Sequence, residues 1–238
     1  MKSLTGLKVK IFADGAERAG MLEMARNPLV RGFTTNPTLM RKAGVEDYEL
    51  FARQILAVIR DRPISFEVFA DEFGEMDRQA RRLAGWAPNV YVKIPVTTTS
   101  GESAVPLVRR LSTGGVKLNV TAVMTLDQVR EVTAALAGGA PGCVSVFAGR
   151  VADTGRDPVP HMAAAVQLVR RAPNVELIWA SPRELLNVFQ ADAVGCDIIT
   201  ATNDILGKLP LVGKALDEYS LETVRMFHDD ATKAGYEL

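Results

Sequence analysis

Short apolar segments recur along the chain, and stretches with helical spacing separate them. Between residues 48 and 60, for example, four apolar residues share one face of a helix: Phe51, Ile55, Val58 and Ile59. The apolar segments are nearly continuous and do not alternate with polar residues, which is typical of parallel strands that helices cover. There are eight of them: KVKIFAD, RGFTTN, ISFEVFA, VYVKIPV, KLNVTAV, CVSVFAG, ELIWAS and DIITAT.

Eight strand–helix units predict an α/β protein with the architecture of a (β/α)8 TIM barrel. An open, doubly wound sheet of the Rossmann type is the alternative that the pattern leaves open. The length of 238 residues matches the usual size of one such barrel. We therefore expect a single domain over residues 1–238.

The strand–helix pattern stops after the eighth segment. Gly207, Pro210 and Gly213 lie close together there, and an amphipathic stretch follows from about Leu221 to Ala234. These features predict a C-terminal helical segment over residues 204–238. The last helix either packs on its own barrel or contacts another subunit, and we expect a homo-oligomer.

Charge and composition narrow the possible partners. The 28 Lys and Arg residues balance the 28 Asp and Glu residues, and the isoelectric point is about 6.8. This balance argues against nucleic acid and against a membrane as partners, and favours a small substrate that is recognised locally. The sequence shows no apolar run of membrane-spanning length and no signal-peptide pattern, so we expect a cytoplasmic protein.

The few cysteines and histidines indicate whether disulfide bonds or a metal site are to be expected. Cys143 and Cys196 lie in or beside apolar runs, as buried, reduced thiols do. The two histidines form no cluster with cysteine, so we expect no metal site.

Polar residues occur in or just after seven of the eight predicted strands. Barrel enzymes assemble their active sites at the carboxyl ends of the strands, so these residues are the candidates for chemistry. They are Asp14, Thr34, Asn36, Glu67, Lys93, Asn119, Thr121, Ser145, Arg150, Ser181 and Arg183.

Lys93 in YVKIPV gives the sharpest hypothesis. An amine in a water-poor pocket has its charged form disfavoured, which leaves more of it free to attack a ketone and form an imine. The alternative is a structural ion pair with Glu67 or Asp14. These two carboxylates suit a proton acceptor and an activator of water, or they simply balance the lysine.

Amide and guanidinium groups suit the binding of a substrate. Asn36 and Asn119 can hydrogen-bond the hydroxyls of a short polyol, although Asn36 also suits a cap before Pro37. Arg150, Ser181 and Arg183 form a second group that can grip a phosphate dianion, assisted by a helix that starts near Arg183. Surface salt bridges are the alternative for the two arginines.

Five motifs in order resemble the transaldolase family, in the short branch that also contains fructose-6-phosphate aldolases. They are FADG, GFTTNPTLM, VKIPVT, LNVTAVMTLDQ and SVFAGRVAD, and the resemblance runs from Ile11 to about Thr202. It implies a barrel enzyme of carbohydrate metabolism and the pentose phosphate pathway, with sugar phosphates as substrates and with no metal or organic cofactor.

The resemblance also implies a role for each matching residue. Lys93 matches the Schiff-base lysine and Asp14 the acid/base carboxylate, while Glu67 and Thr121 match the pair that holds the catalytic water. The matching substrate-binding positions are Asn36 and Asn119 for the dihydroxyacetone unit, Thr34 and Ser145 in support, and Arg150, Ser181 and Arg183 for the phosphate.

Two further positions distinguish group transfer from aldol cleavage within the resembled family. Transaldolases have glutamate at the water-holding position and phenylalanine on strand six, and this chain has Glu67 and Phe147. We therefore expect transfer of a dihydroxyacetone unit from a ketose phosphate to an aldose. Three alternatives remain: an aldolase that releases dihydroxyacetone, a transaldolase whose unusual TTTSGESAVP loop admits a non-standard acceptor, and a non-catalytic barrel that binds sugar phosphates.

Overall fold

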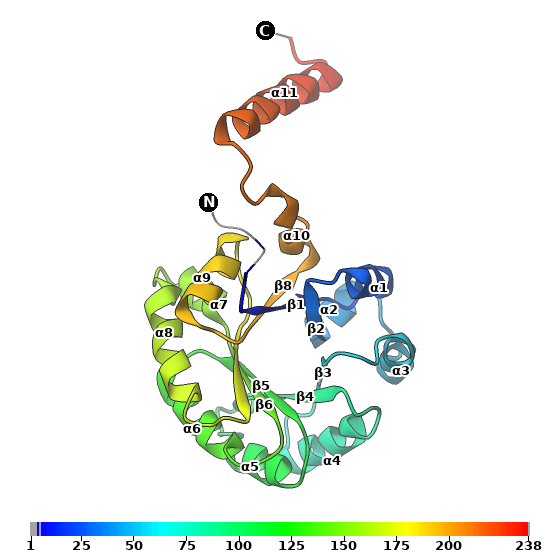
Figure 1. The fold of residues 1–238 in the computed structure, drawn as a ribbon. Helices are drawn as coiled ribbons and strands as arrows, with labels where there is room; N and C mark the ends of the chain where they lie inside the picture. Colours follow the sequence, from blue (N-terminus) through cyan, green and yellow to red (C-terminus); the bar gives the residue numbers. More distant parts are fainter. Residues whose placement is uncertain (1–3, 5, 238) are drawn as a thin grey trace.

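Eight parallel strands form a closed barrel in which each strand pairs with the next and β8 pairs with β1 (Figure 1). The structure, a computed structural model, describes Leu4 and residues 6–237; residues 1–3, 5 and 238, at the ends of the predicted domain, lie outside the described residues. The closed order of the strands confirms the predicted (β/α)8 TIM barrel and rules out an open sheet.

Each predicted strand segment overlaps a strand, with starts that differ by at most two residues. The strands are β1 (Lys10–Asp14), β2 (Val30–Thr34), β3 (Ile64–Glu67), β4 (Val90–Pro95), β5 (Leu118–Val123), β6 (Gly142–Val146), β7 (Val175–Trp179) and β8 (Ile198–Thr202).

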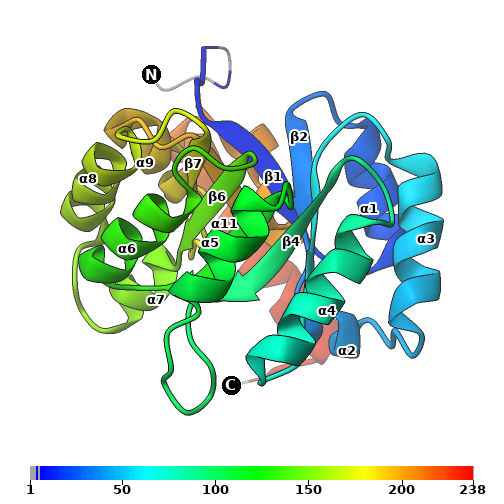
Figure 2. The ribbon, with the colours of Figure 1, turned by 90° about the horizontal axis from the view of Figure 1, so that it is seen from below.

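Helices surround the barrel, as Figure 2 shows from the side of β4 and β6. They are α1 (Arg18–Arg26), α2 (Pro37–Lys42), α3 (Tyr48–Val58), α4 (Phe73–Ala84), α5 (Val105–Thr113), α6 (Leu126–Leu136), α7 (Ala148–Asp153), α8 (Pro158–Val169), α9 (Leu186–Val194), α10 (Asn203–Leu206), the 3₁₀ helix η1 (Leu209–Leu211) and α11 (Leu216–Ala234).

Helix α3 illustrates how sequence sets these elements. The Asp47 side chain caps its first turn by accepting a hydrogen bond from the Leu50 amide. Phe51 and Ile55 are buried against the barrel, as expected. Val58 is 59% exposed, contrary to the prediction. On the helical wheel it lies just past Phe51, outside the arc of side chains that the helix buries.

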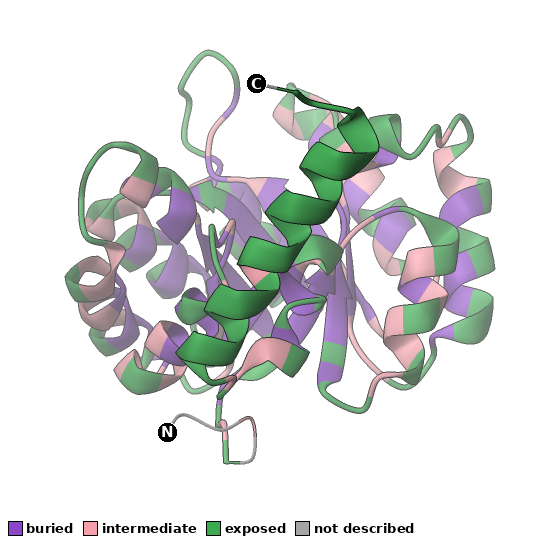
Figure 3. Cartoon of the chain, turned by 90° about the horizontal axis from the view of Figure 1, so that it is seen from above, coloured by how far each residue is buried: buried purple, intermediate pink, exposed green. Residues whose placement is uncertain are grey.

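Two layers of apolar side chains hold the barrel together. The larger layer lies between the strands and the helices and appears as the buried faces in Figure 3. A smaller cluster fills the barrel interior: Phe12, Cys143, Ile178, Ala180 and Ile198. Gly32 makes room for this filling, because a Cβ atom there would lie 2.4 Å from the Phe12 ring. The Cys143 thiol is free, and burial raises its pKa.

Helix α11 departs from the rest of the fold. It begins at Leu216, five residues before the predicted start, and it extends away from the barrel (Figure 1). None of its 19 residues, all of which the structure describes, is buried. Packing on its own barrel, one of the two predicted alternatives, is therefore not what the structure has.

Among the described residues, no helix combines the length and the apolar character that crossing a bilayer requires.

Candidate active site

The carboxyl ends of the strands bring most of the predicted residues together inside the barrel. Backbone register places Glu67 beside Lys93, and Lys93 beside Asn119, on adjacent strands. Asp14 pairs in the same way with Thr34. Because side chains in matching register point to the same side of a sheet, these groups face one interior space.

Lys93 is the buried cation of this space, with a residue exposure of 5%. Its Nζ donates a hydrogen bond to the Thr35 carbonyl oxygen at 2.8 Å and lies 3.1 Å from Glu67 Oε2. The ion pair with Glu67 that was considered as an alternative is thus present. It places a carboxylate at the amine, which is also what an imine-forming lysine needs for proton transfer.

Asp14 lies deep in the same space. Burial raises the pKa of its carboxyl group, while the positive charge of Lys93 and a hydrogen bond from Thr34 act in the opposite direction. The Thr34 hydroxyl donates to Asp14 Oδ1 at 2.7 Å and lies 2.5 Å from the Thr200 hydroxyl. Thr200 was not predicted as a site residue, although its inward position on β8 was a usable signal.

Asn119 is fully buried, and both ends of its side-chain amide are hydrogen-bonded. Its Nδ2 donates to Ser65 Oγ at 3.0 Å, and its Oδ1 accepts from Ser145 Oγ at 2.7 Å. Ser145 therefore acts on Asn119, in a supporting position. Ser65 was missed by sequence reasoning, because a serine within a strand carries no signal of which partner it will meet.

Thr121 lies two residues beyond Asn119 on β5. Its hydroxyl is buried and has no hydrogen-bond partner within the described part of the chain. The next residue, Ala122, has a φ of 59°, and the pairing of β5 with β6 shifts there. This irregular strand end leaves Thr121 with a polar group that a small molecule can satisfy.

Asn36 lies at the rim, half-buried. Its Oδ1 accepts a hydrogen bond from the Leu39 amide at 2.9 Å and caps α2. The capping role considered as an alternative is therefore present, and the side-chain NH₂ is the group that remains for a substrate.

The predicted phosphate-binding residues form a separate, more exposed group. Arg183 binds both carboxylate oxygens of Asp153 through Nε and Nη2, and its Nη1 lies 3.0 Å from Ser181 Oγ. Asp153 was not predicted, and it holds Arg183 in place while competing with any anion for it. One of the salt bridges proposed as the alternative is thus formed.

Arg150 lies on α7, exposed, with its guanidinium carbon 5.7 Å from the centre of the Phe147 ring. Gly149 lets α7 approach the loop after β7, because a Cβ atom there would lie 1.6 Å from the Ser181 carbonyl oxygen. This contact brings Arg150 and Arg183 to neighbouring positions, as their shared effect in lowering the Asp153 pKa indicates.

The helix predicted near Arg183 starts later. Helix α9 begins at Leu186, and the amides of Arg183 and Glu184 both donate to Asn187 Oδ1. The helix N-terminus therefore lies three residues beyond Arg183, and the Asn187 side chain already occupies the amides of Arg183 and Glu184.

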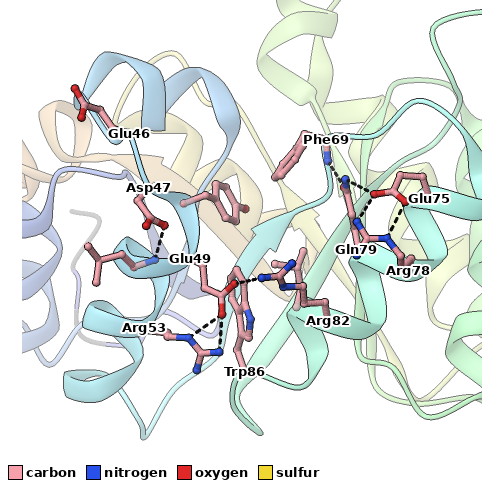
Figure 4. A pocket seen from close by; sticks show the side chains of 13 residues that line it. Glu46, Asp47, Glu49, Arg53, Phe69, Glu75, Arg78, Gln79, Arg82 and Trp86 are labelled. Atoms are coloured by element: carbon pink, nitrogen blue, oxygen red, sulfur yellow. Dashed lines mark hydrogen bonds and ion pairs between the residues drawn. The ribbon is translucent and has the colours of Figure 1, made fainter.

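Other possible sites lie elsewhere. An open pocket of about 890 Å³ lies between α3 and α4 on the outside of the barrel, lined by residues such as Phe69, Arg82 and Trp86 (Figure 4). Among the described residues that line it, none is a predicted site residue. In the same described part of the chain, no group of three or more His, Cys, Asp or Glu side chains suits a metal ion.

Comparison with known proteins identifies relatives of the whole barrel. The family described as transaldolase/fructose-6-phosphate aldolase matches residues 11–238. A probable transaldolase of Dehalococcoides mccartyi is 36% identical over 199 residues, which cover 83% of this chain and 88% of the relative. A probable transaldolase of Lactiplantibacillus plantarum is 35% identical over 223 residues, with 89% and 95% covered.

Solved structures similar to this one share the fold at low sequence identity. A HpcH/Hpal aldolase/citrate lyase family protein from Burkholderia cenocepacia matches with a TM-score of 0.59 and 15% identity, covering 93% of this chain and 96% of that one. KGPDC from Streptococcus mutans matches with a TM-score of 0.55 and 9% identity, covering 83% and 89%. These two matches support the barrel architecture alone.

The raised pKa of Asp14 predicts a pH-dependent effect of Asp14→Asn on stability. A carboxyl group whose pKa is raised by folding stabilises the fold below its unfolded pKa of about 3.9 and loses that contribution as pH rises through the folded pKa. The variant, which cannot ionise, should therefore have a larger free energy of unfolding than wild type at pH 7, and the difference should shrink towards pH 4.

Urea denaturation at both pH values measures the effect. Asp71→Asn is a control with the opposite sign, because hydrogen bonds from Thr99 lower the pKa of the exposed Asp71 carboxyl group. If Asp14→Asn were less stable than wild type at pH 7, the buried charge of Asp14 would not be the dominant effect.

Proposed function

The chain belongs to the transaldolase/fructose-6-phosphate aldolase family, and on that premise we propose that it is a transaldolase that works through a Schiff base on Lys93. The observation that carries the proposal is a buried lysine at the carboxyl end of β4, in contact with Glu67 and close to Asp14. Its substrates are sugar phosphates, and the donor is a ketose phosphate such as fructose 6-phosphate.

In the proposed reaction, Lys93 attacks the ketone carbon of the donor, and loss of water gives a protonated imine. Asp14 accepts the proton of the C4 hydroxyl, and the bond between C3 and C4 breaks. The electron pair of that bond moves into the imine, which becomes an enamine, and an aldose phosphate leaves. The enamine then attacks the aldehyde of an acceptor aldose, Asp14 returns its proton to the new C4 hydroxyl, and hydrolysis of the new imine restores Lys93.

The raised pKa of Asp14 supports its role as a proton acceptor. A carboxylate whose ionised form is destabilised by burial is a better base than a solvated one. The hydrogen bond from Thr34, which Thr200 supports, orients the carboxylate oxygen.

Formation of the imine releases a water molecule next to Lys93, and hydrolysis of the imine consumes one. We assign this water to Glu67 and Thr121. The ion pair between Glu67 and Lys93, together with the buried, unpartnered hydroxyl of Thr121, supports the assignment.

The remaining side chains bind the substrate in this proposal. Asn119, fixed by Ser145, and the free NH₂ of Asn36 hydrogen-bond the dihydroxyacetone unit. Arg150, Ser181 and Arg183 bind the phosphate, for which Arg183 exchanges its contact with Asp153.

We assign transfer, and not release of free dihydroxyacetone, on the identity of two side chains. Glu67 and Phe147 stand at the positions where the resembled transaldolases have glutamate and phenylalanine. The β4–α5 loop, which projects from the barrel in Figure 2, is tied to the preceding loop by hydrogen bonds from Thr99 to Asp71. Its place next to the lysine strand makes it the segment that selects the acceptor aldose.

The exposed apolar side of α11 supports a homo-oligomer. Leu216, Tyr219, Val224 and Phe227 fall within one arc of the helix and are all at least 46% exposed. Within the single domain proposed for residues 1–238, the segment 204–238 then serves as an arm that contacts another copy. We place the protein in the cytoplasm, where phosphorylated sugars are metabolised.

Borohydride trapping tests the covalent step. Wild-type protein treated with fructose 6-phosphate and borohydride should gain a three-carbon adduct on Lys93, detected by intact mass and peptide mapping, because cleavage leaves only the dihydroxyacetone unit on the lysine. Lys93→Ala should give no adduct, whereas Lys8→Ala, a change at an exposed lysine outside the site, should match wild type. Turnover by Lys93→Ala at the wild-type rate would contradict the mechanism.

The phosphate assignment predicts a selective effect on affinity. Arg150→Ala and Arg183→Ala should each raise KM for phosphorylated donors by roughly ten- to a hundredfold and lower kcat much less, because the phosphate lies away from the bond that breaks. Steady-state kinetics with Arg109→Ala, an exposed arginine on α5, provides the control. Large losses in kcat at unchanged KM would assign these arginines a different role.

If the segment 204–238 is an arm that contacts another copy, the assembly of the homo-oligomer depends on α11. A chain that ends at Val212 should have a smaller mass by light scattering than the full chain, and Phe227→Asp should reduce assembly in the same direction. Burial of a phenylalanine side chain is worth about 1.5–3 kcal/mol, which a charge would forfeit. Asp229→Ser, on the same helix, should leave the mass unchanged; equal masses for all variants would show that α11 does not mediate assembly.

A further inference from the structure

Tyr48 connects the outside of the barrel to the backbone of Glu67. It is the first residue of α3, and its ring packs edge-on against Phe66 and Phe69, with centroid distances of 6.2 and 5.5 Å. Its hydroxyl accepts a hydrogen bond from the Glu67 amide and donates one to the Glu67 carbonyl oxygen, both at 2.9 Å. One phenol thus satisfies both backbone groups of a residue that the proposed mechanism uses.

The position of this hydroxyl follows from how β2 and β3 separate. Their pairing ends at Thr34 and Ser65, after which the Thr35 amide donates to the Ser65 carbonyl oxygen at 3.1 Å. A regular parallel ladder would continue with the Glu67 amide donating to the Thr35 carbonyl oxygen. That oxygen instead accepts the hydrogen bond from Lys93 Nζ at 2.8 Å.

We propose that Tyr48 is a positioning residue for the reaction described above: its hydroxyl replaces a backbone group of β2, which fixes Glu67 on β3 and leaves the Thr35 carbonyl oxygen for Lys93. The inference rests on the proposed function and adds to it a residue that does not touch the substrate. Without the hydroxyl, the Glu67 amide and Lys93 compete for the same carbonyl oxygen.

The surroundings of Tyr48 make this contact rigid. Gln79 on α4 accepts hydrogen bonds from the Phe69 and Ala70 amides, so α4 holds the segment directly after Glu67 (Figure 4). The ring of Tyr48 lines the pocket between α3 and α4, where it also contacts Trp86. Burial raises the pKa of the phenol, which keeps the proton that its donated hydrogen bond needs.

The test removes one oxygen atom and keeps the ring. Tyr48→Phe should lower kcat and the rate of borohydride-trappable imine formation by roughly five- to tenfold, while KM for fructose 6-phosphate stays within about twofold, because imine formation and hydrolysis depend on Glu67 and donor binding does not. Tyr91→Phe, the same deletion two residues before Lys93 on β4, should leave both rates unchanged. Equal rates for Tyr48→Phe and wild type would overturn the proposal.

A double-mutant cycle separates positioning from general damage to the fold. In a Glu67→Gln background, the carboxylate that Tyr48 positions is already absent, so adding Tyr48→Phe should cause less than a twofold further loss. A further loss as large as that in the wild-type background would overturn the proposal.

Two further measurements keep the outcomes distinct. In wild-type protein the Glu67 amide should exchange slowly with deuterium, and fast exchange would contradict the hydrogen bond even if Tyr48→Phe failed to fold. A wild-type protein that traps no adduct would refute the proposed function itself. A wild-type protein that traps the adduct at the same rate as Tyr48→Phe would refute the role of Tyr48 alone.

Discussion

The burial of one positive charge governs the carboxyl end of this barrel. The ammonium group of a lysine residue that is 5% exposed is strongly destabilised unless nearby groups compensate its charge and satisfy its protons. Lys93 obtains both from Glu67 and from the Thr35 carbonyl oxygen. The Thr35 carbonyl oxygen in turn does not accept the Glu67 amide as it would in a regular ladder, and the Tyr48 hydroxyl on α3 accepts that amide instead.

Along its axis, the barrel interior consists of an apolar half and a polar half. Phe12, Ile178 and Ile198 fill the amino-terminal half with apolar side chains, while the inward positions further along the strands are polar and hydrogen-bonded to one another. The apolar half excludes water from below and lowers the local dielectric constant, which strengthens every charge interaction above it. Stability and the reactive character of the site therefore come from the same packing.

Much of this arrangement could be predicted from the sequence, and the exceptions have a common physical origin. Eight continuous apolar runs identified the strands, and polar residues within them identified Asp14, Glu67 and Lys93. The residues that sequence reasoning missed, Thr200, Ser65, Asp153 and Tyr48, act through partners 19 to 166 positions away. Their roles arise from strand register and helix docking, which local patterns do not encode. The start of α9 also differs from the prediction for a similar reason. The Asn187 side chain accepts hydrogen bonds from the amides of Arg183 and Glu184, where a first helical turn was expected.

The packing of the Phe12 ring over Gly32 also affects the path by which substrates would reach and leave the site. This ring and its neighbours pack in the barrel interior below the predicted site residues, so substrates of the proposed reaction would enter and leave at the carboxyl ends of the strands. In a two-substrate transfer, the first aldose has to depart before the second can occupy its place. In the proposed mechanism, the covalent bond to Lys93 holds the three-carbon unit while the aldose leaves, so a single entrance would impose an order of release and binding.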